Sequence, residues 1–318
     1  MKKSPFKKKL KIAFWVVFAL GCLWVAYAPP TRLTPPPSVT VKVQQPPPLP
    51  TPEAKAPAPQ PALGGEEQTP QAPAVHNEAV TVPVAPEKEE KIPSGRKLKI
   101  AIVIDDVGPD LTGSEKAIKL PPAVTLSFLP YAARVREEAK EARDDGHELL
   151  LHMPMEPVGH EYPGQGALLV DLPMRDLQQR FENALASFTG FDGVNNHMGS
   201  KFTAWPEGMT MVVDELQQRH LFFLDSRTSA QSVGLKTAEA KGLPAIGRDV
   251  FLDDDQSPDA IRKQLDITER IARRKGYAVA IGHPHAATMA VLGAWTGEAA
   301  GRGVELVPLR DLVKANSD

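Results

Sequence analysis

The sequence predicts an α/β protein whose folded part, from Lys97 onward, is a (β/α) barrel of about seven to eight parallel strands. One observation behind this prediction is that short apolar runs alternate with amphipathic helical stretches, which is the pattern of a parallel sheet. A second is size, because the roughly 220 residues after Lys97 suit one barrel, which needs on the order of 200–250. A closed barrel is favoured over an open doubly wound sheet, since no glycine-rich phosphate-binding turn follows the first apolar run.

The predicted strands are compact apolar runs, and the stretches between them have helical periodicity. Leu98–Asp105 is a β-branched run typical of a strand that is buried on both faces. Ala132–Gly146 is charged, amphipathic and ends at a glycine, as a surface helix does. The other predicted strands are Ala123–Leu129, His147–Met153, Gly193–Asn195, His220–Asp225, Leu243–Val250, Tyr277–His283 and Val304–Leu309. The other predicted helices are Gly113–Lys119, Met174–Phe188, Glu207–Arg219, Ala230–Lys241, Pro258–Lys275 and Ala286–Gly301.

The beginning of the chain predicts a membrane segment. Several lysines precede Ile12–Ala28, an uncharged apolar run whose length of about 17 residues is the lower limit for spanning a bilayer. Only Arg32 follows closely, so the positive-inside rule places the N-terminus in the cytoplasm and the rest of the chain outside. We expect a single-pass, uncleaved anchor in a bacterial-type cytoplasmic membrane, with the domain in the periplasm. A secretory signal cleaved after Ala28 is the alternative.

The next segment predicts a disordered, proline-rich stalk. Of the 32 prolines, 18 fall between Pro29 and Pro93, a stretch without Phe, Trp or Tyr. Such a stretch cannot bury enough apolar surface to offset its ordering entropy. The chain therefore divides into a basic tip with a membrane segment at 1–28, a linker at 29–96 and one folded domain at 97–318. The net charge of -2 gives no reason to expect a nucleic-acid partner, and the oligomeric state stays open.

Polar residues gather at the ends of the predicted strands. In a barrel, the carboxyl ends of the strands converge on one rim, where active sites are built. A single Asp or His at such a place is an ordinary loop residue or helix cap, whereas six strand ends in succession point to a site. These residues are Asp105, Asp106, His152, Glu156, Asn195, Asn196, His197, Asp225, Arg227, Arg248, Asp249, His283 and His285.

Carboxylates and imidazoles that meet at one point suit a divalent metal ion, and zinc is the ion we expect. The single cysteine, Cys22, lies in the predicted membrane segment, so the domain offers no thiolate ligand. A catalytic metal site keeps one position open for water and lowers the pKa of that water. A spare carboxylate can then take a proton from the water, and a spare histidine can protonate the leaving group.

Four short motifs carry a family resemblance. "VIDDVG" (Val103–Gly108) resembles the aspartate pair of polysaccharide deacetylases, and "GHELLLHMPME" (Gly146–Glu156) resembles their second motif. "NNHMGS" (Asn195–Ser200) and "IGHPH" (Ile281–His285) fall where their third and last motifs lie. With "LDSRTS", the set is similar to the divergent polysaccharide deacetylase family over Lys97–Lys314. The resemblance implies a NodB-like barrel and metal-dependent removal of N-acetyl groups from a cell-envelope glycan such as peptidoglycan.

The resemblance also implies roles for individual residues. Asp105 matches the general base, Asp106 the first metal ligand and His152 the second. His283 matches the general acid, and Asp225 is expected to orient it by a hydrogen bond.

The sequence departs from the family pattern at two positions. Glu156 stands where the second histidine of the usual pair would be, and the third motif offers Asn195, Asn196 and His197 in place of Arg and Pro. The third metal ligand is therefore either Glu156 or His197, and the sequence leaves both open.

Other polar residues complete the prediction. Candidates for substrate binding are Asn195, Asn196, Arg227, Arg248 and His285, whereas Asp253–Asp255 is expected to be a solvated helix cap. Two alternative functions remain. One is a catalytically inactive barrel that binds an envelope glycan or protein, since residues of the usual motifs are replaced. The other is a metal hydrolase of another bond, suggested only by the Asp and His composition.

Overall fold

The computed structural model describes residues 97–317, which form one α/β domain. The predicted membrane segment at 12–28 and the predicted stalk at 29–96 lie outside the described residues, so both stay predictions. Within residues 97–317, no helix combines the length and the apolar character needed to cross a bilayer.

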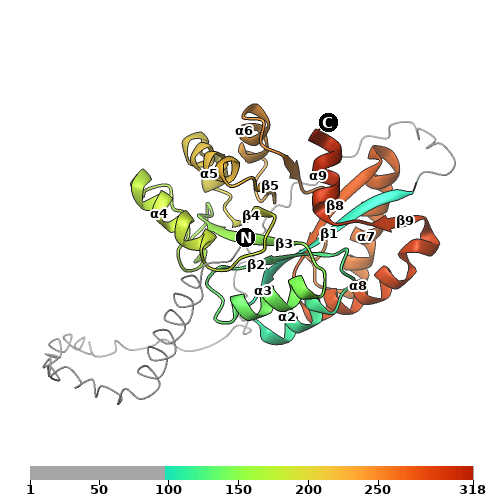
Figure 1. Ribbon diagram of the computed structural model, residues 1–318. Coiled ribbons are helices and arrows are strands. Elements are labelled where there is room, and N and C mark those ends of the chain that lie inside the picture. Colours follow the sequence, from blue (N-terminus) through green and yellow to red (C-terminus); the bar gives the residue numbers. More distant parts are fainter. Residues whose placement is uncertain (1–96, 318) are drawn as a thin grey trace, which may run out of the picture. The chain divides into compact units, whose positions relative to one another are not determined.

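One parallel sheet forms the centre of the domain, and it curls into a barrel-like shape with helices on its outside (Figure 1). The strands are β1 Leu98–Val107, β2 Thr125–Phe128, β3 Leu149–Met155, β4 Gly193–Met198, β5 Phe222–Asp225, β6 Ala245–Gly247, β7 Val250–Phe251, β8 Tyr277–Gly282 and β9 Val304–Leu306. The order across the sheet is β6-β5-β4-β3-β2-β1-β8-β7, and β9 pairs with β1. The predicted α/β barrel is thereby confirmed as a fold class, but β6 and β7 at the two ends of the order are not paired with each other, so the sheet is curled and not closed.

All seven predicted helices are present in the described part of the chain. The helices are α2 Leu111–Ile118, α3 Val135–Asp144, α4 Met174–Leu185, α5 Pro206–Gln218, α6 Gly234–Ala240, α7 Pro258–Lys275, α8 Ala286–Glu298 and α9 Leu309–Ser317, with 3-10 turns at Phe202–Ala204 and Ala299–Arg302. Of these, α3, α4, α6 and α8 are shorter than predicted, α7 has the predicted bounds, and α2 and α5 begin one or two residues earlier. Helix α7 begins and ends as its sequence predicts: the Ser257 hydroxyl accepts a hydrogen bond from the Ala260 amide, and Gly276 closes the helix at φ 89°.

The predicted strand Leu243–Val250 is divided in two. Among the strands of residues 97–317, β6 pairs only with β5, and β7 pairs only with β8. Between them, the Arg248 amide donates to the Asp225 carbonyl (3.0 Å) and the Asp249 amide to the Val279 carbonyl (2.8 Å), so the chain crosses from one edge of the sheet to the other. The expectation that a helix follows every strand is wrong at this point, because β6 and β7 are separated by two residues only.

Side chains alternate between two apolar cores, as the period of two in a strand requires. The outer core lies between the sheet and the helices and includes Ile100, Ile102 and Ile104 of β1. The inner core fills the barrel and includes Ala101 and Val103 of the same strand. Inside the barrel, the sequence of β1 thus changes from apolar to acidic at the next inward position, which is Asp105.

Helix α9 covers the end of the barrel at which the strands begin. Its residues Leu309, Leu312 and Val313 belong to the inner core. At the start of the helix, the fully buried Glu148 carboxylate accepts hydrogen bonds from the Arg310 amide (3.1 Å) and from the Thr125 hydroxyl (2.9 Å). The Arg310 guanidinium lies 3.2 Å from the same carboxylate, so a buried charge fixes the helix to the sheet.

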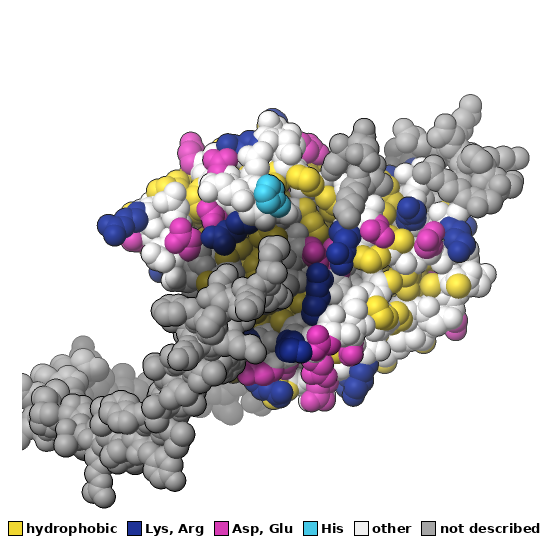
Figure 2. Space-filling model, viewed as in Figure 1, with side chains coloured by type: hydrophobic (Ala, Val, Ile, Leu, Met, Phe, Trp, Pro, Cys, Tyr) yellow, Lys and Arg dark blue, Asp and Glu magenta, His cyan; other side chains and the backbone are white. Residues whose placement is uncertain are grey.

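The outer surface is mixed in charge. Lys and Arg side chains alternate with Asp and Glu over the face seen in Figure 2, with hydrophobic side chains between them. This mixture agrees with the small net charge of the sequence.

The ion pair of Glu148 and Arg310 yields a prediction for stability. We expect Arg310→Met to lower the free energy of unfolding by about 2 kcal/mol, because it leaves a buried carboxylate without its cation. Urea unfolding measures the change. The matched control is Arg262→Met, since the Arg262 and Asp259 side chains are 60% and 95% exposed, and its effect should stay within about 0.5 kcal/mol. Equal effects of the two substitutions would contradict the role given to Glu148.

Candidate active site

The inward positions of the strands carry a polar layer directly above the inner apolar core. Along β3, Leu150 belongs to the inner core and His152 is the next inward residue. Along β8, Val279 and Ile281 belong to it and His283 follows. The alternation of apolar core and polar rim therefore places Asp105, His152 and His283 on one inner surface at the carboxyl ends of the strands.

Asp106 joins this surface through an irregularity in β1. The register between β1 and β2 shifts between Ile104 and Val107, and Asp106 has φ 56°, in the left-handed region. A regular strand would point Asp106 away from Asp105, because neighbouring side chains lie on opposite faces. The left-handed conformation costs about 1–2 kcal/mol for a residue other than glycine. Strain of this kind is typical of functional sites.

Three side chains from three strands meet at one point. The Asp106 Oδ1 atom lies 3.2 Å from His152 Nε2 and 2.8 Å from His197 Nδ1. These atoms are all within 4.8 Å of one another. The two imidazole rings are tilted edge to face, with centroids 5.0 Å apart. The strands β1, β3 and β4 thus supply one carboxylate oxygen and two ring nitrogens.

This donor set fits a divalent metal ion. The Asp106 Oδ1 atom is buried and makes no hydrogen bond, although two ring nitrogens lie beside it. A buried carboxylate oxygen beside two ring nitrogens is an arrangement that could hold a divalent cation. Burial alone would raise the pKa of Asp106, but the imidazoles of His152 and His197 hold it well below its usual range. One oxygen and two nitrogens also match the three protein ligands of catalytic zinc sites.

Asn195 connects the metal-binding residues with Asp105. Its Nδ2 atom donates to both carboxylate oxygens of Asp105, at 2.9 and 3.0 Å, and lies 3.1 Å from the Ser226 hydroxyl. Its Oδ1 atom accepts from the Ser127 hydroxyl at 2.6 Å and lies 2.9 Å from His152 Nδ1. The Nδ1 atom of His152 must therefore carry its proton, which leaves Nε2 free to bind a cation.

The buried Asp105 and His152 side chains shift the pKa values of each other. Burial raises the pKa of Asp105, and the nearby His152, His283 and Asn195 offset part of this rise. Burial lowers the pKa of His152, but Asp105 and Asp106 raise it by more, so the net shift is upward. Asp105 also lies 3.6 Å from His152 Nε2.

His283 is oriented by Asp253, and the expected partner Asp225 does not contact it. The Asp253 carboxylate lies 3.0 Å from His283 Nδ1 and accepts from the His283 amide (2.7 Å) and the Thr288 hydroxyl (2.8 Å). Asp253 is only 3% exposed, so the expectation of a solvated cap is wrong for this residue. Although burial disfavours the charged imidazole, Asp253 raises the pKa of His283 to about 9. A second group of Asp253, His283 and His285 lies within metal-binding range. We assign it no cation, because both Asp253 oxygens already accept hydrogen bonds.

Asp225 has a structural role in the neighbouring loop. Its side chain follows Leu224, which belongs to the inner core, so the alternation directs it outward. Its oxygens accept hydrogen bonds from the Arg227 amide (2.9 Å), the Ser232 hydroxyl (2.8 Å) and the Leu235 amide (3.1 Å). The next residue, Ser226, is the one that reaches the polar layer.

Glu156 lies apart from the metal-binding group. One of its oxygens pairs with Lys201 Nζ at 2.6 Å, and the other accepts from the Val170 amide at 2.6 Å. These contacts hold the long loop after β3 against the start of the loop after β4. Of the two alternatives for the third ligand, the structure brings His197 to Asp106 and His152 and leaves Glu156 outside.

The remaining predicted residues divide between structure and surface. The Asn196 side chain forms hydrogen bonds with the backbone: its Nδ2 donates to the Met198 carbonyl, and its Oδ1 accepts from the Ser226 amide. Arg248 donates to the carbonyls of Ser226 (2.6 Å) and Arg227 (2.8 Å), and burial lowers its pKa. His285 is exposed and lies 3.1 Å from Gln256 Nε2.

Three residues of the layer were not predicted from the sequence. Asp253 lies in a run of three acids, which resembles a solvated helix cap. Only its contact with His283 distinguishes it from Asp254 and Asp255. Ser127 and Ser226 are small hydroxyl residues without a motif of their own. The alternation of inward and outward residues along β2 and β5 is the signal that would have found both.

A comparison with family models identifies the family of this chain. The model of the family described as divergent polysaccharide deacetylase matches residues 102–313. An uncharacterized protein of Haemophilus influenzae is 39% identical over 194 residues, which are 61% of this chain and 69% of that protein. The uncharacterized protein YibQ of Escherichia coli is 37% identical over 194 residues, which are 61% of each chain. The crystal structure of an uncharacterized protein from Agrobacterium tumefaciens superposes with a TM-score of 0.67 at 36% identity, covering 70% of this chain and 91% of that one. The chain therefore belongs to the divergent polysaccharide deacetylase family.

Proposed function

We propose that the domain is a metal-dependent hydrolase that removes N-acetyl groups from a polysaccharide of the cell envelope, with peptidoglycan as the first substrate to test. The observation that carries the proposal is the group formed by Asp106, His152 and His197 around an acceptor without a hydrogen bond. Asp105 and His283 lie in the same polar layer, and each contributes to the electrostatic environment of the other.

The proposal gives Asp106, His152 and His197 the role of holding a divalent metal ion, with zinc as the expected ion. When bound, such an ion polarises a substrate carbonyl and lowers the pKa of water, which is the chemistry that amide hydrolysis requires. Asp105 is the proposed general base, because it is fixed by Asn195 beside the ligands and is not itself one of them. A carboxylate in this position can take a proton from the attacking water.

His283 is the proposed general acid. Its Nδ1 atom faces the Asp253 carboxylate, so the proton available to a leaving amine is the one on Nε2. A pKa of about 9 keeps the imidazole charged near neutral pH. Departure of the sugar nitrogen requires a proton, which a charged imidazole supplies.

Aromatic side chains near the group support a sugar substrate. Tyr162 is 77% exposed in the loop after β3. Burial raises the pKa of Tyr131, and the charge of Asp106 and the neighbouring Tyr162 raise it further, so Tyr131 lies close to Asp106 and Tyr162 lies close to Tyr131. An exposed tyrosine offers a flat apolar face with a polar tip, which is suited to sugar rings.

The place of action is proposed from the sequence. The basic tip and the apolar run at 12–28 support an anchor in the cytoplasmic membrane, with the domain on its outer side. The proline-rich stretch at 29–96 would then separate the domain from the bilayer. The envelope glycan is the partner that this placement makes accessible.

The first prediction concerns turnover. The protein loaded with zinc should release acetate from N-acetylated glycan, and Asp105→Asn should reduce the rate by about 10²–10⁴-fold, because it removes the proposed base. Acetate release measures the rate. The matched control is Asp254→Asn, which neutralises an exposed aspartate and should leave the rate within about twofold.

Acetate release at background level, with stoichiometric metal bound, would contradict the proposal. Tight glycan binding without turnover would then favour the inactive binding barrel. Turnover of an ester or phosphoester substrate alone would favour a hydrolase of another bond.

The second prediction concerns Asn195. Asn195→Ala removes the acceptor that fixes the proton of His152, and we expect affinity for zinc to fall by about 10–100-fold. Competition with a chelator measures the affinity. Ser127→Ala removes one hydrogen bond to the same Asn195 oxygen and should cause a smaller loss. Asn183→Ala, on the exposed face of α4, is the control and should change nothing. Unchanged affinity in Asn195→Ala would show that His152 is oriented by other contacts.

The third prediction concerns pH. Folding raises the pKa of His283 from 6.5 to about 9, so its charged form stabilises the folded state fully below about pH 6.5. This contribution is lost as the pH rises through about 9. Asp253→Asn removes the facing charge and should lower the pKa of His283 by at least about one unit.

An NMR titration of the His283 ring, with urea unfolding across the same pH range, measures both effects. Thr288→Ala, which removes a hydrogen bond to Asp253 but keeps its charge, should cause a smaller shift. An unchanged pKa in Asp253→Asn would assign the shift to another group.

A further inference from the structure

Tyr131 lies at the rim of the barrel, between the strands that supply Asp106 and His152. It follows β2 by three residues, and β2 lies between β1 and β3 in the sheet. The Leu129 amide donates to the Val107 carbonyl at 3.0 Å. The loop after β2 is thus fastened to the residue that follows Asp106.

A close contact on the other side of Tyr131 continues this attachment. A Cβ atom at Gly108 would lie 2.5 Å from the Ala132 Cβ, so the loops after β1 and β2 are in direct contact. Gly108 has φ 121°, a conformation that favours glycine. Burial raises the pKa of the Tyr131 hydroxyl, and the charge of Asp106 raises it further. The hydroxyl therefore lies within electrostatic reach of a proposed metal ligand.

The long loop after β3 covers the hydroxyl end of the Tyr131 ring. A Cβ atom at Gly164 would lie 2.5 Å from the ring atom Cε1 and 2.8 Å from both Cζ and the hydroxyl oxygen. The Glu156 amide donates to the Leu168 carbonyl at 2.9 Å, which holds the two ends of this loop together. The phenol is therefore packed between two loops, and a larger residue at 164 would displace it.

The Tyr131 hydroxyl is a fixed donor that has no acceptor of its own. It forms no hydrogen bond within residues 97–317, and the residue is only half-buried. The upward shift of its pKa keeps the hydroxyl protonated at neutral and mildly alkaline pH. Such a hydroxyl can donate to an acceptor that the substrate brings.

Other side-chain donors of the polar layer are already engaged. The Asn195 amide donates to Asp105, and the Ser127 hydroxyl donates to the Asn195 oxygen. Arg248 donates to two backbone carbonyls. In the proposed reaction, His283 gives its Nε2 proton to the leaving amine.

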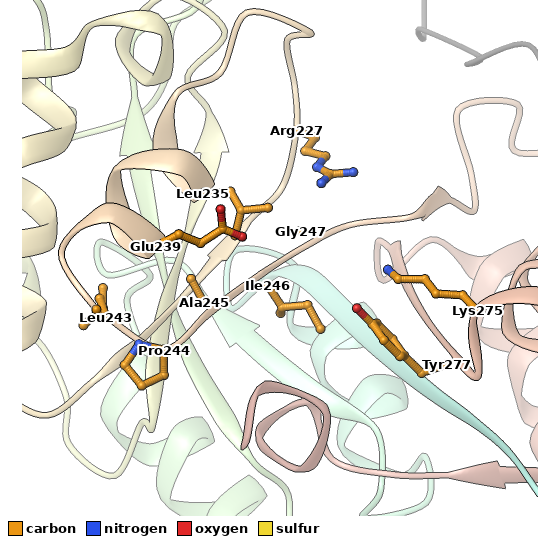
Figure 3. Close-up of a pocket in the computed structure, with 11 residues that line it drawn as sticks. Arg227, Leu235, Glu239, Leu243, Pro244, Ala245, Ile246, Gly247, Lys275 and Tyr277 are labelled. Carbon is orange, nitrogen blue, oxygen red and sulfur yellow. The ribbon is translucent and has the colours of Figure 1, made fainter. Parts of the chain in front are cut away.

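Arg227 is directed away from the polar layer. It lines a cavity of about 450 Å³ beside β6, together with Glu239 and Lys275 (Figure 3). A Cβ atom at Gly247 would lie 2.5 Å from Arg227 Nε, so the guanidinium lies against the backbone of β6. Tyr131 thus remains as an unused side-chain donor beside Asp106.

We propose that the Tyr131 hydroxyl is a further catalytic group, which donates a hydrogen bond to the carbonyl oxygen of the substrate as negative charge develops there. The inference rests on the proposed function, because it requires an amide carbonyl beside the proposed metal ligands. When the water oxygen bonds to the carbonyl carbon, the water proton passes to Asp105 and one pair of carbonyl electrons moves to the oxygen. The hydroxyl stabilises this oxyanion. When the carbon–nitrogen bond breaks, the oxyanion pair forms the carbonyl again, and the nitrogen keeps the bonding pair and takes the proton of His283.

Kinetics and binding with Tyr131→Phe test this role, because the substitution keeps the ring and removes only the hydroxyl. For the full chain loaded with zinc, we expect kcat for acetate release from an N-acetylated oligosaccharide to fall by about 10²–10³-fold, with KM within about twofold. Calorimetry with the methylphosphonamidate of the same oligosaccharide, whose tetrahedral phosphorus carries charged oxygens, should show a similar loss of affinity. The affinity for zinc, measured by competition with a chelator, should not change. The matched control is Tyr277→Phe, at the first residue of β8 and far from the rim, which should leave all four quantities unchanged.

Gly164→Ala tests how the hydroxyl is positioned. The added Cβ atom displaces the ring, so kcat should fall by about tenfold. In the Tyr131→Phe background the same change should lower kcat by less than about twofold, since no hydroxyl is left to position. Equal losses in the two backgrounds would overturn the positioning role of Gly164.

The outcomes separate this inference from the proposed function. A wild-type kcat in Tyr131→Phe, or a rise in KM alone, would overturn the catalytic role and leave the deacetylase proposal intact. A loss of zinc affinity as large as the loss of kcat would assign Tyr131 to the metal site and would also overturn that role. No acetate release by the wild type, together with equal phosphonamidate affinity in the wild type and Tyr131→Phe, would overturn both proposals.

Discussion

The side-chain amide of Asn195 is the constraint on which the polar layer depends. Its oxygen faces the Ser127 hydroxyl and His152, and its nitrogen faces Asp105 and Ser226. The opposite orientation would set the amide oxygen against a carboxylate, which is repulsive, so only one orientation is favourable. One neutral group therefore fixes both the proton of His152, a proposed metal ligand, and the position of the proposed base.

The apolar core beneath the polar layer strengthens the electrostatic interactions within that layer. The barrel interior below Asp105 and His152 is filled by Ala101, Val103, Leu150 and other apolar side chains, and α9 covers the far end. Water is thus excluded from one side of the layer, and interactions between charges are stronger there than in solvent. This explains why the pKa values of Asp106 and His283 move far from their usual values in opposite directions. The apolar floor and the charged rim are consecutive positions on the same strands.

The fold class and two of the candidate metal ligands, Asp106 and His152, could be predicted from the sequence, because both depend on local patterns. Alternating apolar runs predict the strands, and strand ends predict the rim that brings Asp106, His152 and His197 together. The partner of His283 could not be predicted in this way. Asp225 and Asp253 are both acids after apolar runs, and only the direction of each side chain separates them. Nor could the choice between Glu156 and His197 be made, since it depends on Lys201 and the Val170 amide, which are far from Glu156 in the sequence.

The divided strand explains both the pairing of His283 with Asp253 and the cavity beside Arg227. In the register of β7 with β8, Phe251 pairs with Ile281, and the Leu252 amide donates to the Ile281 carbonyl. Two residues further along both chains, the same register sets Asp253 beside His283. If the strand had continued beside β5 alone, Asp253 would not reach the barrel interior next to β8. The displacement that sets Asp253 beside His283, the proposed general acid, also opens the second edge of β6, and so creates the cavity beneath Arg227. The pairing of His283 and the cavity are thus two consequences of one change of partner within a single strand.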